Sequence, residues 1–398
     1  MTSTLDPQTT LDDQVITWRR HLHANPELSF QEHATADYVE AQLRAMPGLT
    51  LSRPTPTSVL AVLQGGGGPG RTLLMRADMD ALPIQEDTEY AFASKNDGVM
   101  HACGHDGHTA MLLGAAQVLT GLASQLPGEI RFIFQHAEEL FPGGGQQLVD
   151  AGIMRGVDVA IGAHLFSPIP VGLVALKAGP LMAAPDTFTV TVTGRGGHGA
   201  MPHETVDPIV IACHIVTALQ AIVSRQRDPL EPAVLSVTTI HAGTAHNIIP
   251  NAVQLSGTVR TFDPGLREQI PQWMERLIRG VTEGFGAAYT FEYECGYRAT
   301  INDPEITEVL RGVVRDTLGE DALVEAQPTM GGEDFSAYLS EAPGAFMFIG
   351  ARNEDAGITA PHHHPKFAID EAALGHGVKV LVEAARRLTV WDTGRPAT

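Results

Sequence analysis

Cysteine is scarce in this chain of 398 residues, which contains only Cys103, Cys213 and Cys295. Three scattered cysteines are too few for a disulfide framework. Cys213 falls within an apolar helical pattern and Cys295 within a strand-like segment, so we expect both to be packing residues. Only Cys103 has polar neighbours of the kind that bind metals.

Basic side chains are also few, since 26 Lys and Arg face 46 Asp and Glu and give a net charge of -20. This excess opposes long contacts with a phosphate backbone or an anionic membrane. No apolar run reaches the roughly 18 residues of a membrane-spanning helix. The first residues lack the basic and apolar regions of a secretory signal. We therefore expect no nucleic-acid partner, no membrane association and a cytoplasmic location.

The composition is that of a globular protein, with 43% hydrophobic and 18% charged residues. The length exceeds that of one ordinary core, so two domains of unequal size are expected. Helical patterns at residues 8–46 and 107–123 alternate with short apolar runs at 59–65, 71–78, 130–135 and 157–166. This alternation predicts an α/β domain with a central mixed sheet covered by helices.

The pattern changes between residues 185 and 296. A strand-like TFTVTVTG precedes a helix at 207–226, two further strand-like runs, a helix at 265–284 and the strand-like YTFEYECGY. The order strand, helix, strand, strand, helix, strand is that of a ferredoxin-like α+β domain. The α/β pattern then resumes with a helix near 304–318 and a final helix at 370–388. We predict one domain formed by residues 1–184 and 297–398, with residues 185–296 inserted into it.

Side chains that bind metals recur at the ends of the predicted strands. They occur in RADMD (76–80), HACGHDGH (101–108), QHAEEL (135–140), GAHLF (162–166) and PHHHPKF (361–367). Strand ends of an open α/β sheet converge on one crevice, so these distant segments can build one site. Thiolate, imidazole and carboxylate together suit zinc, manganese or another borderline divalent ion.

Each of these segments also has an ordinary structural interpretation. A lone Cys-x-His is a weak signal, and His164 could be a capped core histidine. Glu138 and Glu139 could form a solvated turn, and the three histidines from residue 362 could be a surface tract. Their joint occurrence favours a site, because so many ionisable groups are costly to place together unless something balances their charge.

Several longer motifs together resemble a known family. They are RRHLHANPELSFQE, MRADMDALPIQE, MHACGHDGHTAMLLGAA, QHAEE, GAHLF, GRGGHGAMPH, AHNIIPNAVQLSGTVRTFD, MGGEDFSAYL and HHHPKFAIDEAAL. The chain is similar, from residue 19 to about residue 388, to the dinuclear metallopeptidase family that also holds aminoacylases and carboxypeptidases. The resemblance is closest to its hippurate hydrolase and indoleacetyl-amino-acid hydrolase branch.

The resemblance implies a metal-dependent amidohydrolase that converts an N-acyl amino acid, such as hippurate or an N-acetyl or indoleacetyl amino acid, into a carboxylic acid and a free amino acid. It also implies two divalent metal ions per subunit, of zinc, manganese, cobalt or nickel. The inserted domain would be a lid that mediates dimerisation, so a homodimer or homotetramer is expected. The alternatives are a dipeptidase or carboxypeptidase on the same scaffold, or a non-catalytic metal- or ligand-binding protein.

Matched position by position, the resemblance implies five metal ligands: Cys103, which would bridge the ions, His105, Glu139, His164 and His363. The wider family usually has a histidine ligand where this chain has Asp78, a departure that the cysteine-containing branch shares. Asp80 is then expected to hold a ligand in orientation. Asp106 and His108 are expected to support the ligands or begin a helix.

The same matching implies the roles of four further residues. Glu138 matches the general base, which takes a proton from water and passes it to the leaving nitrogen. His198 matches a residue that stabilises the oxyanion and typically reaches the site of the partner subunit. Asn247 and Arg260 match positions that hold the substrate and its carboxylate, for which the planar guanidinium of arginine is suited. Without the resemblance, His198 would be read as a loop histidine and Arg260 as the partner of a nearby acid.

Overall fold

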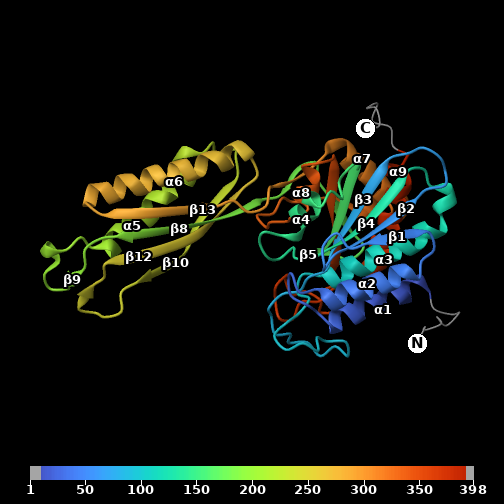
Figure 1. The fold of residues 1–398 in the computed structure, drawn as a ribbon, viewed down its shortest axis with the longest axis horizontal. Helices are drawn as coiled ribbons and strands as arrows, with labels where there is room; N and C mark the ends of the chain where they lie inside the picture. Colours follow the sequence, from blue (N-terminus) through green and yellow to red (C-terminus); the bar gives the residue numbers. More distant parts are fainter. Residues whose placement is uncertain (1–9, 391–398) are drawn as a thin grey trace. The chain divides into compact units, whose positions relative to one another are not determined.

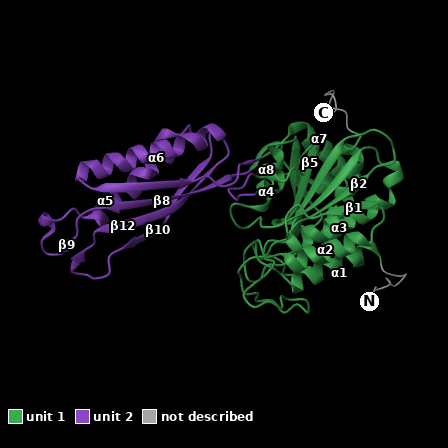
Figure 2. Ribbon diagram, in the orientation of Figure 1, with its two compact units in different colours: residues 1–181, 301–327, 334–398 green, residues 182–300, 328–333 purple. Residues whose placement is uncertain are grey.

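The computed structural model describes residues 10–390. The chain forms two compact units, which Figure 2 distinguishes by colour. Of the described residues, unit 1 comprises 10–181, 301–327 and 334–390, and unit 2 comprises 182–300 and 328–333. The helical pattern predicted from residue 8 begins outside the described residues, and its described part starts at Leu11.

An eight-stranded mixed sheet forms the centre of unit 1 (Figure 1). Its order is β1 (Leu49–Ser52), β2 (Val59–Gln64), β4 (Glu129–Gln135), β3 (Thr72–Asp78), β5 (Val159–Pro170), β16 (Gly344–Arg352), β6 (Val174–Leu176) and β15 (Leu323–Glu325). β3 pairs in parallel with β4 and β5, and β5 pairs in parallel with β16. The carboxyl ends of these four strands therefore meet at one edge of the sheet.

The longer helices of unit 1 share one hydrophobic core with the sheet. They are α1 (Leu11–Ala24), α2 (His33–Arg44), α3 (His105–Gly121), α7 (Pro304–Leu318) and α9 (Ala372–Leu388). α3 lies between α1 and α9, and α9 also contacts α7. The short helices α4 (Gly144–Asp150) and α8 (Ser336–Leu339) contact each other. The predicted α/β domain with a central mixed sheet is confirmed.

Unit 2 contains a four-stranded antiparallel sheet in the order β10-β12-β8-β13. Its elements along the chain are β8 (Ala184–Thr193), α5 (Pro208–Ala221), β10 (Ala233–Ala242), β12 (Ala252–Thr261), α6 (Pro264–Phe285) and β13 (Ala288–Glu294). Both helices pack into a core of their own, in which Ile215 and Ile270 join Val190 and Leu255 of the sheet. This is the predicted ferredoxin-like arrangement.

Short elements complete the chain. β9 (Gly197–His198) pairs with β11 (Ile248–Ile249), and β7 (Gly179–Met182) pairs with β14 (Thr300–Asn302). A π-helical turn (Ile222–Gln226) continues α5, and 3-10 turns lie at Ala123–Gln125, Pro202–Glu204 and Glu320–Ala322.

Helix α5 corrects the expectation that no segment is long and apolar enough to span a membrane. Together with its π-helical extension it covers Pro208–Gln226, which is sufficient by length and composition. The sequence count missed it because single polar residues such as Thr217 interrupt the apolar run. One such helix is weak evidence for a membrane, because core helices pass the same test and Ile211 and Leu219 are buried in unit 2.

The expectation for two cysteines was wrong, since Cys213 and Cys295 are both exposed. Cys213 adjoins the buried Ala212 on α5 but faces outward, because residues next to each other on a helix point in different directions. Cys295 follows the last residue of β13, where the strand pairing has ended.

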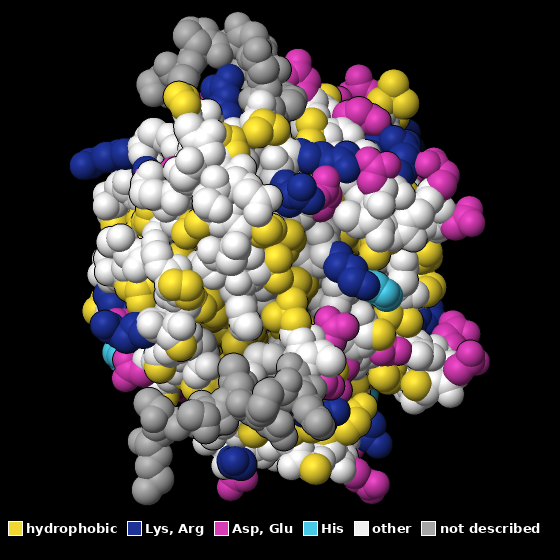
Figure 3. Space-filling view, turned by 90° about the vertical axis from the view of Figure 1, so that its right-hand side faces the viewer, with side chains coloured by type: hydrophobic (Ala, Val, Ile, Leu, Met, Phe, Trp, Pro, Cys, Tyr) yellow, Lys and Arg dark blue, Asp and Glu magenta, His cyan; other side chains and the backbone are white. Residues whose placement is uncertain are grey.

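The face of unit 1 seen in Figure 3 carries basic and acidic side chains close to one another, with apolar atoms between them. Several ion pairs at the surface of this unit are of that kind, such as Arg387 with Asp316 at 2.7 Å and Arg315 with Glu308 at 3.2 Å. Such mixed charge neutralises the basic groups locally, so this face offers no extended positive surface.

Candidate metal centre

The parallel strands of unit 1 bring the metal-binding side chains to one edge of the sheet. Asp78 ends β3, Glu138 and Glu139 follow β4, and His164 lies within β5. Cys103 and His105 occupy the turn into α3, where Gly104 adopts a left-handed φ of 99° that favours glycine. His363 follows β16 in the chain.

The five side chains expected to bind metal lie together in two overlapping groups. Cys103, His105 and His164 offer ligand atoms within 4.8 Å of one another, and so do Cys103, Glu139 and His363. Cys103 Sγ lies 3.4 Å from His164 Nε2, and His363 Nε2 lies 3.3 Å from Glu139 Oε1. Cys103 belongs to both groups, which is the position that a bridging ligand requires.

Backbone carbonyls orient two of the histidines toward these groups. His105 Nδ1 lies 2.9 Å from the carbonyl oxygen of Asp80, and His164 Nδ1 lies 2.7 Å from that of Leu165. Because a carbonyl only accepts, Nδ1 carries the hydrogen in both rings and Nε2 is left for another partner. Among the residues that the structure describes, the buried Nε2 of His105 has no hydrogen-bond partner. A buried nitrogen that has a free lone pair and no hydrogen-bond partner fits a bound cation.

The electrostatics of the cluster lead to the same conclusion. Burial, together with Glu139, Glu138 and Asp78, raises the pKa of the Cys103 thiol well above its usual range. Burial opposes a charge on His105, yet Asp78, Asp80 and Glu139 raise its pKa to about 10. The cluster therefore holds more negative charge than its own histidine balances, and divalent cations would compensate it.

Asp80 contacts two of these five residues, the side chain of His105 and the backbone of Glu139. Its Oδ2 accepts the backbone N–H of Glu139 at 2.9 Å and the hydroxyl of Ser29 at 2.7 Å, and its Oδ1 lies 3.3 Å from His105 Nδ1. Asp80 is almost wholly buried, and hydrogen bonds from His105 and Glu139 help to lower its pKa against the effect of burial. An ionised Asp80 thus links the turn after β4 to His105.

Asp78, His105 and His108 form a further group whose atoms are close enough to hold a metal. The hydrogen bonds of His108 argue against this use. Its Nε2 accepts the N–H of Leu165 at 2.8 Å, and its Nδ1 lies 2.6 Å from Asp78 Oδ1. Both ring nitrogens of His108 are therefore occupied, and Arg76 binds the other oxygen of Asp78 at 2.6 Å.

Two further residues of this region have distinct surroundings. Asp106 Oδ2 accepts a hydrogen bond from Arg19 Nε at 2.8 Å and lies 2.8 Å from His23 Nδ1. These contacts connect the start of α3 to α1. Glu138 is only 8% exposed, and its Oε2 lies 4.0 Å from His105 Nε2. Glu138 is thus next to the candidate ligands.

Sequence reasoning missed three residues at this edge. Ser29 and Glu32 contact Asp80 and the turn after β4, and His362 Nε2 accepts the N–H of Ser167 at 3.0 Å. The only available signal for Ser29 and Glu32 was their presence in the motif PELSFQE. His362 was hidden in a run of three histidines.

In unit 2, the structure brings His198 and Asn247 together. His198 pairs with Ile248 in the ribbon of β9 and β11, and the carbonyl of Asn247 accepts the N–H of Gly199 at 2.8 Å. Arg260 lies elsewhere, one residue before the end of β12, whereas the ribbon precedes the start of that strand. β12 has 10 residues and spans roughly 30 Å, so Arg260 is remote from the other two within this unit.

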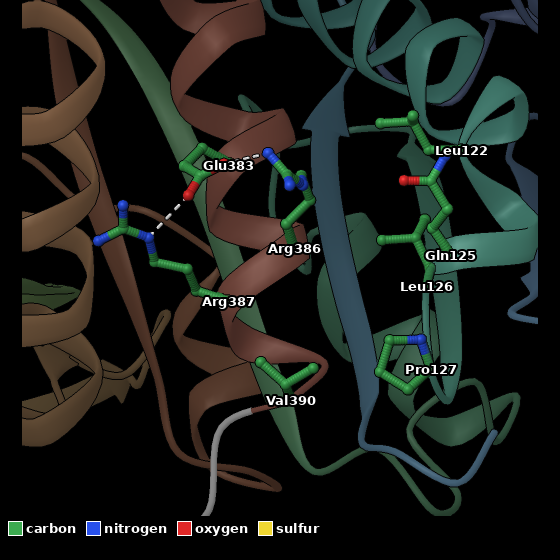
Figure 4. Close-up of a pocket in the computed structure, with 8 residues that line it drawn as sticks. All are labelled: Leu122, Gln125, Leu126, Pro127, Glu383, Arg386, Arg387 and Val390. Atoms are coloured by element: carbon green, nitrogen blue, oxygen red, sulfur yellow. Dashed lines mark hydrogen bonds and ion pairs between the residues drawn. The ribbon is translucent and has the colours of Figure 1, made fainter. Parts of the chain in front are cut away.

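A cavity of about 300 Å³ in unit 1 lies away from this centre (Figure 4). It is lined by Leu122, Gln125, Leu126, Pro127, Glu383, Arg386, Arg387 and Val390. These residues precede β4, belong to the last turns of α9 or follow it, and none of them belongs to the groups of metal-binding side chains. Glu383 pairs with both arginines at 2.9 Å, so the cavity has no unbalanced charge from them. It is not the candidate active site.

The fold and the site together define a class: a two-domain α/β protein with an inserted ferredoxin-like domain and a cysteine-, histidine- and carboxylate-lined centre suited to metal-dependent hydrolysis. Residues 74–387 match the model of peptidase family M20/M25/M40. The chain belongs to that family.

Similar proteins include enzymes of two kinds. The chain is 60% identical over 291 residues to an N-acyl-L-amino acid amidohydrolase of Geobacillus stearothermophilus, covering 73% of this chain and 78% of that protein. It is 43% identical to thermostable carboxypeptidase 2 of Saccharolobus solfataricus, in a match that covers 92% of this chain and 93% of that protein. The structure also matches the crystal structure of the YXEP protein of Bacillus subtilis, which is described as a dinuclear metal binding peptidase. The TM-score is 0.81 and the sequence identity is 36%, and the match covers 94% of this chain and 97% of that chain.

Proposed function

We propose that this protein is a metal-dependent amidohydrolase that cleaves N-acyl amino acids into a carboxylic acid and a free amino acid. The observation that carries the proposal is the meeting of Cys103, His105, Glu139, His164 and His363 in two groups that share Cys103, with Glu138 beside them. The 60% identity to an N-acyl-L-amino acid amidohydrolase supports the choice of substrate class.

The two groups suggest how a pair of divalent ions would be held. Cys103 would serve both, with His105 and His164 on one side and Glu139 and His363 on the other. The ions, when bound, lower the pKa of water and polarise the scissile carbonyl. Zinc, manganese, cobalt and nickel all suit this mixture of ligands.

Glu138 supplies the proton transfers in this proposal. A carboxylate next to the ligand group can take a proton from the attacking water and give it to the leaving nitrogen, so that the amine departs uncharged. Asp80 keeps the neighbouring Glu139 in place through its backbone N–H. Burial of Glu138 among these groups keeps bulk water from competing for the proton.

Unit 2 would be the lid that recognises the substrate, with His198 stabilising the oxyanion and Asn247 and Arg260 holding the amino-acid half. Because β12 separates Arg260 from His198 and Asn247, one copy of unit 2 cannot offer all three to one small substrate. We therefore propose a homodimer in which His198 of one copy serves the metal centre of the other.

A substrate panel on protein of measured metal content tests the activity. N-acetyl, benzoyl and indoleacetyl amino acids are expected to be hydrolysed, with turnover lost after chelation and restored by Zn²⁺ or Mn²⁺. No hydrolysis of any N-acyl amino acid by the metal-loaded protein would refute the proposal and leave a metal-binding protein without this activity.

Subunit mixing tests the dimer. His198→Ala and Glu138→Gln proteins, each inactive alone, are expected to recover activity when unfolded together and refolded, because a mixed dimer contains one complete site. If the protein is dimeric by light scattering but mixing restores nothing, His198 does not act across subunits.

A carboxypeptidase activity on the same scaffold is the second candidate. The 43% identity to thermostable carboxypeptidase 2 over nearly the whole chain supports it. Dipeptides and N-blocked dipeptides in the same panel separate the two functions, because both break an amide bond and differ only in the group on its acyl side. Faster turnover of peptides than of N-acyl amino acids would favour the carboxypeptidase.

A further inference from the structure

The loop between α1 and α2, residues 28–32, packs against the turn that carries Glu138 and Glu139. Leu28 forms an isolated parallel bridge with Ala81, and the hydroxyl of Ser29 donates to Asp80 at 2.7 Å. Glu32, at the end of the loop, is fully buried and reaches the turn directly. All of these residues belong to unit 1.

The turn after β4 has an uncommon backbone conformation. Ala137 has a φ of +49°, in the left-handed region that residues other than glycine seldom adopt. Its carbonyl accepts the N–H of Gly144 at 2.9 Å, and its own N–H donates to Glu32 Oε1 at 2.8 Å. Two residues further on, the N–H of Glu139 donates to Asp80 at 2.9 Å. The backbone is thus held by buried carboxylates on both sides of Glu138.

Glu32 stabilises a second strained residue with the same atom. Phe30 has a φ of +66°, and its N–H donates to Glu32 Oε1 at 3.0 Å. One carboxylate oxygen therefore joins the loop at Phe30 to the turn at Ala137. Removing it would leave the buried N–H of Ala137 and the partly buried N–H of Phe30 without their acceptor, and the left-handed turn would lose what holds it.

We propose that Glu32 is a positioning residue which, by accepting the N–H of Ala137, holds the left-handed turn that directs Glu138 and Glu139 into the metal centre. Glu32 lies outside the candidate ligand groups and acts only through the backbone. This inference rests on the roles proposed above for Glu138 and Glu139.

Glu32→Ala and Glu32→Gln test the proposal, since glutamine keeps an oxygen that can accept and alanine does not. We expect Glu32→Ala to lower kcat roughly 10–100-fold with KM little changed, because small displacements of a catalytic group cost rate. We expect its Zn²⁺ affinity, measured by chelator competition, to fall about 10–100-fold as Glu139 shifts. Glu32→Gln should stay within about threefold of the parent in both measurements, since it keeps the acceptor.

Glu27→Ala is the matched control. Glu27 belongs to the same segment and also accepts hydrogen bonds from backbone N–H groups, those of Ala34 at 3.2 Å and Thr35 at 2.7 Å. These two residues lie in the first turn of α2, so Glu27 does not hold the turn at Ala137. We expect Glu27→Ala to lower the melting temperature while kcat and Zn²⁺ affinity stay at parent values.

Three results would overturn the inference. If Glu32→Ala keeps the parent values of kcat and Zn²⁺ affinity, Glu32 has no positioning role. If Glu27→Ala loses as much kcat and Zn²⁺ affinity as Glu32→Ala, the effect is a general loss of stability and not a loss of positioning. A Glu32→Gln protein as impaired as Glu32→Ala would mean that the charge matters and the acceptor does not. If Glu32→Ala does not fold, Glu32→Leu fills the space without an acceptor and is measured instead.

The Zn²⁺ measurement separates this inference from the proposed function. A parent protein that binds Zn²⁺ but hydrolyses no N-acyl amino acid would refute the activity, while the affinity of the Glu32 variants would still test the turn. Conversely, an active parent with unaffected Glu32 variants would refute only the positioning role.

Discussion

Glu138 and Glu139 are neighbours whose side chains have different surroundings. Both lie near His105, but only Glu139 also belongs to the group that contains Cys103 and His363, whereas the other group that contains Glu138 is formed with Glu333 and Asp334. We expect Glu138→Gln to keep its metal content but lose turnover at least 100-fold, because the proton acceptor is gone. Glu139→Ala should lose metal as well as activity. Elemental analysis and a turnover assay check both, and equal metal loss would contradict this division of roles.

Glu32 also gives the unfolding free energy a specific pH dependence. Burial, with a smaller contribution from the charge of Asp80, raises the pKa of Glu32 from 4.5 to about 7. The folded protein then holds this proton more tightly than the unfolded chain. Its stabilising effect is complete below pH 4.5 and is lost as the pH rises through 7.

Glu32→Gln should remove this dependence. Relative to the variant, the metal-free parent is expected to lose roughly 2–3 kcal/mol of unfolding free energy between pH 5 and pH 8. Urea denaturation of both proteins at the two pH values measures the difference. Parallel pH profiles would show that Glu32 titrates near its ordinary pKa.

At the scale of elements, α3 depends on a glycine where it passes between α1 and α9. A Cβ on Gly114 would lie 2.8 Å from Val15 Cγ2 of α1 and 2.8 Å from Val378 Cγ2 of α9. Both neighbours are β-branched and have little freedom to move away. Gly114→Ala should therefore destabilise the protein by about 1–2 kcal/mol, since overpacking exceeds the gain in helix propensity.

Gly121→Ala provides the control in the same helix. Among the described residues nothing lies within 4 Å of a Cβ at Gly121, so the substitution should be neutral or stabilising by up to about 1 kcal/mol. Chemical denaturation of the two variants measures the contrast. Equal effects would show that α3 adjusts its packing around position 114.

The elements that the sequence predicted well are those with a clear period or a long apolar run. The run TLLMRAD is buried at almost every position of β3. The apolar residues of α9 recur with the period of a helix, and these are the residues that form its buried face. The strands Val174–Leu176 and Leu323–Glu325 were missed because three residues cannot show a period. β5 also runs on to Pro170, so His164 lies inside the strand and not near its end.

The candidate site shows a similar limit. Parallel strand ends predict that Cys103, Glu139 and His164 approach one another, and the structure places them in adjoining groups. The contacts of Glu32 with Ala137 and of Ser29 with Asp80 join residues 105 and 51 positions apart. Such contacts depend on how α1 and α2 pack against the sheet, and no local pattern in the sequence encodes them.

At the scale of the whole molecule, the two units have separate hydrophobic cores and only unit 1 contains the candidate metal centre. A ligand that binds the folded state stabilises the part of the protein that it binds, by about 2.7 kcal/mol at 100 times its dissociation constant. Calorimetry of the full chain should therefore show two unfolding transitions. Zn²⁺ should raise the midpoint temperature of one of them, and a chelator should lower the midpoint temperature of that same transition.

The assignment of that transition can be checked with Glu139→Ala, in which the Zn²⁺-dependent shift should shrink while the other transition keeps its temperature. Ile270 is buried in the core of unit 2. Ile270→Val should lower the metal-independent transition, because a smaller side chain leaves a gap in that core. A single transition that responds to Zn²⁺ and to Ile270→Val alike would mean that the two cores unfold as one cooperative unit. In that case metal binding in unit 1 would also stabilise the fold that carries His198 and Arg260.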